Sequence, residues 1–252
     1  MLIDDPLFYV VAVVAVLIYG ISKSGFGSGL GVLGVPLMAL VISPGQAAGI
    51  MLPVLCVMDI FNVWHYRRTW DRRNLVVLLP AGLLGILIGT FTFHYLSDAH
   101  IRILIGLIAV VFVANFYLRR YRKQKPAGFS WWRGSLWGTI AGFTSFGVHA
   151  GGPPVNIYLL PQRLDKSLFV GTTVIFFAVV NYVKLIPYYF LDQLNPSNLA
   201  TSLVLAPLAP LGVWLGLKLH DRVNERLFYN LAYFFLLVTG VKLLYDGVVA
   251  LF

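Results

Sequence analysis

Gly20-Ile-Ser-Lys-Ser-Gly-Phe-Gly-Ser-Gly-Leu-Gly31 is a glycine-rich stretch inside an apolar segment, and Gly142-Phe-Thr-Ser-Phe-Gly-Val-His-Ala-Gly-Gly-Pro-Pro154 is a second one. Three glycines of the first stretch, at positions 20, 25 and 29, each have a counterpart 122 residues later. Non-helical backbone is tolerated inside a membrane only where protein buries it or where it lines a cavity. We therefore expect two matched breaks in membrane helices, an arrangement typical of the substrate site of a transporter.

The composition predicts a membrane protein. Of the 252 residues, 59% are hydrophobic and 12% are charged, whereas a soluble domain carries about 25% charged residues. Nineteen basic residues against ten acidic ones give a net charge of +9. In a soluble protein this excess would suggest a nucleic-acid partner, but here the basic residues fall in the predicted loops. We therefore expect membrane lipid, and no nucleic acid, around the chain.

Apolar runs of about 20 residues are long enough to span a bilayer as helices. Six such helices are expected, at 47–65, 75–96, 100–119, 167–190, 196–218 and 228–246. Two further pairs of segments flank the glycine-rich breaks, 6–22 with 30–43 and 131–145 with 153–161. We interpret each pair as half-helices that enter the membrane to mid-depth and return. The alternative is that each member crosses the membrane with local thinning or tilt.

Basic residues favour cytoplasmic loops and so indicate the orientation. They cluster in alternate predicted loops, with Arg67, Arg68, Arg72 and Arg73 in the first, Arg119, Arg120, Arg122, Lys123 and Lys125 in the central linker, and Arg163, Lys166, Lys218, Arg222 and Arg226 further on. The loops between them, at 1–5, 43–46, 191–195 and 247–252, contain none. The pattern predicts that both termini lie outside the cell and that the linker is cytoplasmic.

The same spacing predicts two repeats of opposite orientation, at 1–120 and 131–252, joined by the basic linker 121–130. Asp59 and Asn181 share the 122-residue offset, and the pattern Pro80-x4-Gly85-x3-Gly89 recurs from Pro207 at an offset of 127. Each repeat would hold a broken or re-entrant helix pair followed by three transmembrane helices, giving an all-α polytopic fold. Inverted repeats with broken helices are the pattern of secondary transporters. A duplicated helix bundle without a transport role is the alternative.

The second break carries a family resemblance. Ala141-Gly-Phe-Thr-Ser145, His149-Ala-Gly-Gly-Pro-Pro-Val-Asn-Ile-Tyr-Leu-Leu-Pro161 and Phe169-Val-Gly-Thr-Thr-Val-Ile-Phe176 resemble the TauE/SafE family of membrane permeases, as does the first break less closely. The resemblance covers nearly the whole chain. It implies export of sulfite, organosulfonates or related sulfur anions across the bacterial inner membrane.

An anion that enters a membrane loses its hydration shell and needs donors in its place. Backbone N–H groups at half-helix starts, hydroxyls and intramembrane cations can supply them, and glycine lets the backbone approach closely. The expected substrate-binding residues are Lys23, Ser24, Gly25, Gly27, Gly29, Ser145, His149, Gly151, Gly152 and Asn156. For Lys23 the alternative is a side chain that reaches the interface, and for His149 a packing role.

Four further polar residues lie on the predicted helices 47–65 and 167–190. Asp59 and Asn62 share one helical face, as do Asn181 and Lys184. Ionisable groups inside a membrane are costly and usually functional. Asp59 could bind a coupling proton, or it could pair with a lysine such as Lys184 and only stabilise the bundle.

The sequence indicates no enzyme. It offers no nucleophile and base at workable spacing, no histidines at metal-ligand spacing and no cofactor motif, so we expect no catalytic residue, metal or cofactor. The expected function is a secondary transporter that exports a small sulfur oxyanion or organosulfonate. An anion channel, or an importer of a related anion such as thiosulfate, are the alternatives, and a homo-oligomer stays possible.

Overall fold

The computed structural model describes residues 2–25, 31–120, 126–219 and 225–251, and every secondary-structure element in these ranges is helical. The elements in the amino-terminal half are α1 (Pro6–Gly25), η1 (Gly31–Leu33), α2 (Gly34–Met38), α3 (Pro44–Tyr66), α4 (Arg72–His94) and α5 (Asp98–Arg120). Those in the carboxy-terminal half are α6 (Trp131–Val148), α7 (Gly152–Leu159), η2 (Leu160–Gln162), α8 (Lys166–Phe190), α9 (Pro196–Leu205), α10 (Leu208–Leu219) and α11 (Glu225–Val249). The predicted all-helical fold is confirmed.

Polar residues fix where several helices begin. The side chains of Ser43, Asp71, Ser130 and Asn195 each accept a hydrogen bond from the backbone N–H three residues later, at the starts of α3, α4, α6 and α9. Such caps satisfy donors that have no partner within the helix. They set the depth at which each helix enters the bundle.

Six helices are long and apolar enough to cross a membrane, namely α1, α3, α4, α5, α8 and α11. The predicted helices 47–65, 75–96, 100–119, 167–190 and 228–246 correspond to single helices. The prediction of one continuous helix at 196–218 was wrong, because this segment consists of α9 and α10, which meet at a bend of 44° and together are long and apolar enough for one broken span. Pro207 lies at this bend and has no N–H with which to continue the hydrogen-bond ladder.

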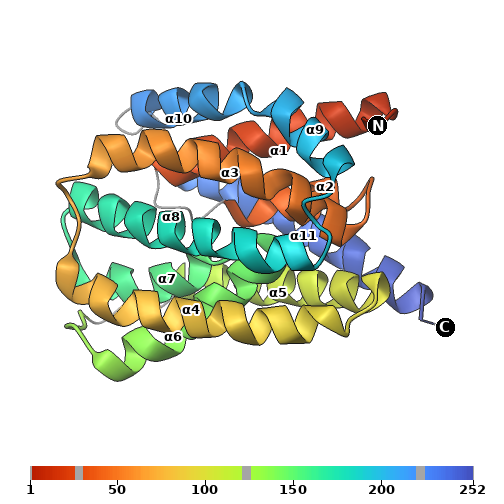
Figure 1. The fold of residues 1–252 in the computed structure, drawn as a ribbon. Coiled ribbons are helices and arrows are strands. Elements are labelled where there is room, and N and C mark those ends of the chain that lie inside the picture. Colours follow the sequence, from red (N-terminus) through yellow and green to blue (C-terminus); the bar gives the residue numbers. More distant parts are fainter. Residues whose placement is uncertain (1, 26–30, 121–125, 220–224, 252) are drawn as a thin grey trace.

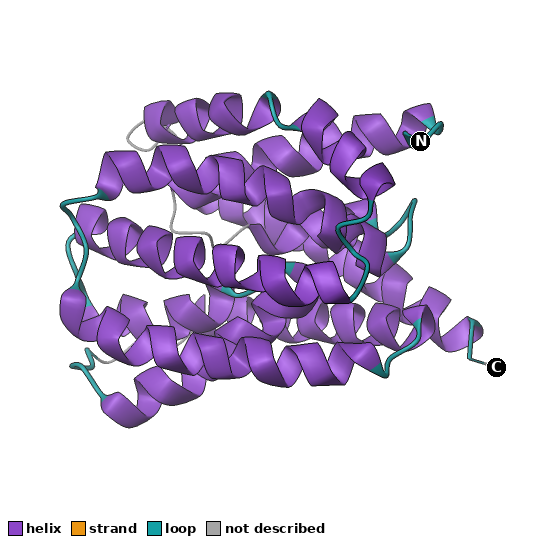
Figure 2. Cartoon of the chain, viewed as in Figure 1, coloured by secondary structure: helices purple, strands orange, loops and turns teal. Residues whose placement is uncertain are grey.

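The long helices lie roughly along one common axis, some parallel and some antiparallel, and the two termini are at the same end of the bundle (Figure 1). The loop from α3 to α4 lies at the opposite end (Figure 2). The main packing partners come from different halves of the sequence, since α1 packs on α10, α4 on α6, α3 on α8 and α5 on α11. The two halves are therefore interleaved.

Glycines allow two of these helix pairs to touch backbone to backbone. A Cβ atom on Gly20 would lie 2.8 Å from the Cα of Gly212, and one on Gly85 would lie 2.9 Å from the Cα of Gly142. Small residues permit such close approach in membrane helix bundles. Gly142 follows Gly20 by 122 residues and Gly212 follows Gly85 by 127, so the two contacts use equivalent positions of the sequence repeat.

Candidate functional site

A buried polar cluster lies where α1, α3, α6 and α8 meet. The Nζ atom of Lys23 is 2.6 Å from Oδ1 of Asp59. Asn181 donates a hydrogen bond from Nδ2 to Oδ2 of the same carboxylate, at 2.7 Å. All three side chains are at most 2% exposed. The predicted pairing of Asp59 with a lysine is thus seen, and the partner is Lys23.

The second part of the cluster surrounds Lys184. Its Nζ atom lies 2.9 Å from the carbonyl oxygen of Ser145, 3.1 Å from the Ser145 hydroxyl and 2.7 Å from Nδ1 of His149. Nε2 of His149 lies 3.0 Å from the carbonyl oxygen of Ala48, which can only accept. Nδ1 of His149 also lies 3.2 Å from the carbonyl oxygen of Ser145. Each ring nitrogen of His149 thus faces a carbonyl oxygen, and Nδ1 faces the Lys184 side chain as well.

The end of α6 presents these groups because the chain turns sharply there. His149 follows the last residue of α6 and has a left-handed backbone conformation with φ of 54°. Its N–H bonds the carbonyl of Ser145, while its own carbonyl accepts the hydroxyl of Tyr19 from α1 at 2.9 Å. The first helix thus touches the second glycine-rich break directly. The structure brings α1 and this break together deep in the bundle.

Two tyrosines anchor the broken helices at equivalent positions. Tyr66, at the end of α3, donates to the carbonyl of Ser24 at 3.0 Å. Tyr188, near the end of α8, donates to the carbonyl of Phe146. Each member of the second contact follows its counterpart by 122 residues. Because α3 and α8 run in opposite directions (Figure 1), α1 and α6 end toward opposite ends of the bundle and are longer than half-helices that stop at mid-depth.

The remaining predicted residues have different surroundings. Gly27 and Gly29 lie outside the described residues. Ser24 Oγ, Asn62 Oδ1 and Asn156 Oδ1 are buried and have no hydrogen-bond partner within the described part of the chain. The Ser24 hydroxyl, one residue from Lys23, thus has no partner among the residues that the structure describes.

The glycines beside the cluster serve close packing. A Cβ atom on Gly25 would lie 2.7 Å from the carbonyl oxygen of Gly216, and one on Gly151 would lie 2.7 Å from that of Ala141. Gly152, the first residue of α7, is also buried. Gly25 thus allows α1 to pack closely on α10, and Gly151 allows the chain after α6 to pack back on α6.

The charges of the cluster are unequal. Within the described ranges, the ion pairs are Lys23 with Asp59 and the exposed Lys242 with Asp246. Lys184 is completely buried and its contacts with Ser145 and His149 are all to neutral atoms. With both lysines protonated, the cluster would hold two ammonium groups and one carboxylate. Burying an unpaired charge is costly.

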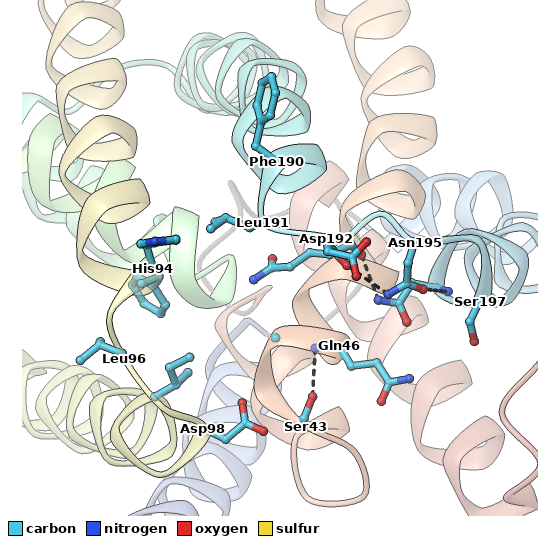
Figure 3. A pocket seen from close by; sticks show the side chains of 15 residues that line it. Ser43, Gln46, His94, Leu96, Asp98, Phe190, Leu191, Asp192, Asn195 and Ser197 are labelled. Carbon is cyan, nitrogen blue, oxygen red and sulfur yellow. Dashed lines mark hydrogen bonds between the residues drawn. The ribbon is translucent and has the colours of Figure 1, made fainter.

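A cavity of about 640 Å³ is lined by the ends of α4 and α8 and the starts of α3, α5 and α9 (Figure 3). Its lining is mostly polar and includes Gln46, His94, Asp98, Asp192 and Asn195. The cavity also reaches Gly45, in the first turn of α3, which lies one helical turn before the Ala48 carbonyl that binds His149. This cavity could not be predicted from the sequence, because its residues come from helix ends and loops without periodic patterning.

The described residues contain no group of three or more histidine, cysteine or acidic side chains that could hold a metal ion. The chemistry of the cluster is that of charge and hydrogen bonding.

Comparison with known proteins assigns the family. The family model described as "Sulfite exporter TauE/SafE" matches residues 12–243, nearly the whole chain. No curated protein and no solved structure was found to be similar. The match includes both glycine-rich breaks and every residue of the buried cluster. The chain therefore belongs to the TauE/SafE family of membrane transporters for sulfite and related sulfur anions.

Proposed function

We propose that this protein is a secondary transporter that exports a small sulfur-containing anion, such as sulfite or an organosulfonate, by alternating access. The observation that carries the proposal is the buried cluster, in which Lys23 pairs with Asp59 and Lys184 contacts Ser145 at the end of α6. The positive charge of this site would stabilise an anion that has lost its hydration shell. The proposed contacts are the residues predicted at the breaks, with Asp59, Asn62, Asn181 and Lys184 as the charge-balancing group.

The proposed mechanism uses two inverted repeats, 1–120 and 131–252. Recurring contacts support it, since the Tyr66–Ser24 and Tyr188–Phe146 hydrogen bonds are displaced by 122 residues. Asp59 and Asn181, which share that offset, bond each other. Contacts between equivalent positions are expected at an axis that relates two repeats.

The proposed direction is outward, with both termini outside the cell and the linker 121–130 in the cytoplasm. The basic loops would then attract anions at the cytoplasmic end. At the other end, Asp98 and Asp192 line the cavity and would disfavour the return of a released anion. The negative-inside potential of a bacterial inner membrane would also help to expel an anion.

Reconstitution in liposomes tests this proposal. We expect saturable flux of sulfite or a sulfonate, faster than flux of acetate, and faster uptake of labelled substrate when the vesicles are loaded with unlabelled substrate. Such counterflow is a property of carriers. Single-channel currents would instead support an anion channel, and flux of acetate alone would contradict the substrate class.

A further inference from the structure

Each half of the chain places one ammonium group beside the carboxyl end of its broken helix. Lys23 lies in the last turn of α1. Lys184 belongs to α8, but its Nζ atom contacts Ser145 in the last turn of α6. Ser145 follows Lys23 by 122 residues, so it occupies the equivalent position. The side chains of Lys23 and Lys184 therefore lie at equivalent helix ends, those of α1 and α6, although the two lysines are not at equivalent positions of the sequence repeat.

Only one of these places has its own carboxylate among the described residues. Asp59 neutralises Lys23 in the first half. The equivalent residue in the second half is Asn181, which is neutral and donates its amide to Asp59. The three donors of the Lys184 ammonium meet two neutral atoms of Ser145 and a neutral nitrogen of His149. Among the described residues, Lys184 thus lacks the negative partner that Lys23 has.

We propose that the transported anion binds at Lys184, in the place of this missing carboxylate, and that the site prefers an anion with one negative charge over one with two. This inference rests on the proposed carrier function and specifies its substrate class. One negative charge balances the cluster, whereas a second would leave an unpaired negative charge in a buried site. Hydrogen sulfite and monosulfonates carry one charge, and sulfate carries two.

Methanesulfonate and sulfate test the inference, because they have similar size and shape and differ by one charge. We expect the purified wild-type protein to bind methanesulfonate at least about tenfold more tightly than sulfate in calorimetric titrations at one ionic strength. Lys184→Met should weaken methanesulfonate binding by roughly 30-fold or more, the size expected when one partner of a buried charge pair is removed. Lys242→Met removes an exposed lysine and is the matched control.

Two further variants separate total charge from local contacts. Asp59→Asn adds one positive charge to the cluster and should shift the preference toward sulfate. Lys23→Met combined with Asp59→Asn restores the total charge and should shift the preference back toward methanesulfonate relative to Asp59→Asn alone. Both expectations follow from the same sum of charges, because Asp59 carries the one carboxylate that contacts the cluster within the described residues.

The outcomes distinguish this inference from the carrier proposal. Equal or tighter binding of sulfate by the wild-type protein would overturn it, as would unchanged methanesulfonate binding by a folded Lys184→Met protein. Liposome flux of a sulfur anion would leave the carrier proposal standing in both cases, and absence of all flux would contradict that proposal itself. Where Lys184→Met does not fold, the wild-type comparison decides, since it requires no variant.

Discussion

Removing the charge of Asp59 should destabilise the protein much more than removing the Lys23–Asp59 pair together. The two atoms are 2.6 Å apart and both side chains are at most 1% exposed. At an effective dielectric constant of about 20, their attraction is about 6 kcal/mol, most of which offsets the cost of burying the two charges. Asp59→Asn retains the shape of the side chain but leaves Lys23 as an unpaired buried cation. We expect this variant to lose about 3–5 kcal/mol of stability.

The measurement is a double-mutant cycle of SDS-induced unfolding in mixed micelles. Lys23→Met alone should also cost about 3–5 kcal/mol, because it leaves the carboxylate unpaired. The double variant should cost several kcal/mol less than the sum of the two single variants, since it leaves neither charge alone. If the two effects add to within about 0.5 kcal/mol, the residues do not interact and the assignment of the pair is refuted.

Three other variants follow from specific contacts. Gly142→Val should cost about 1–3 kcal/mol of stability in the same unfolding assay, because its Cβ would lie 2.0 Å from the carbonyl oxygen of Gly82, while Gly128→Ala, with open space around it, should have no effect. His149→Ala should be about 1 kcal/mol less stable than His149→Gly, because only glycine adopts the φ of 54° without strain; equal stabilities would contradict this conformation. Tyr188→Phe removes one buried hydrogen bond worth about 1 kcal/mol. By easing local opening it should raise the alkylation rate of the buried Cys56 thiol about fivefold. An unchanged rate, equal to that of the exposed control Tyr245→Phe, would show that the hydrogen bond does not limit opening.

The positions of the spans could be predicted because apolar runs and polar caps are local properties of the sequence. The bend between α9 and α10 could not be predicted from proline alone. Pro80 lies inside the continuous helix α4, whereas Pro207 separates two helices. A second proline, Pro210, follows in the first turn of α10, where the missing N–H would have no helical partner in any case. A new helix start is therefore compatible with this sequence in a way that a continuous helix is not.

The composition of the site could be predicted, but its pairings could not. Helical spacing placed Asp59 and Asn62 on one face and Asn181 and Lys184 on another, without fixing how these faces meet. The sequence therefore left open which lysine pairs with Asp59. In the structure Lys23 forms the ion pair with Asp59, and Lys184 contacts Ser145 at the end of α6. The choice depends on the relative rotation of packed helices, which no local pattern encodes.

The glycine contacts determine which helices can move together. α1 is held against α10 through Gly20 and Gly212, and α6 against α4 through Gly142 and Gly85. Each broken helix is thus fastened to a helix from the opposite half of the chain. A rigid body that swings during a transport cycle must then combine segments from both halves, so the boundary between moving parts does not coincide with the midpoint of the polypeptide.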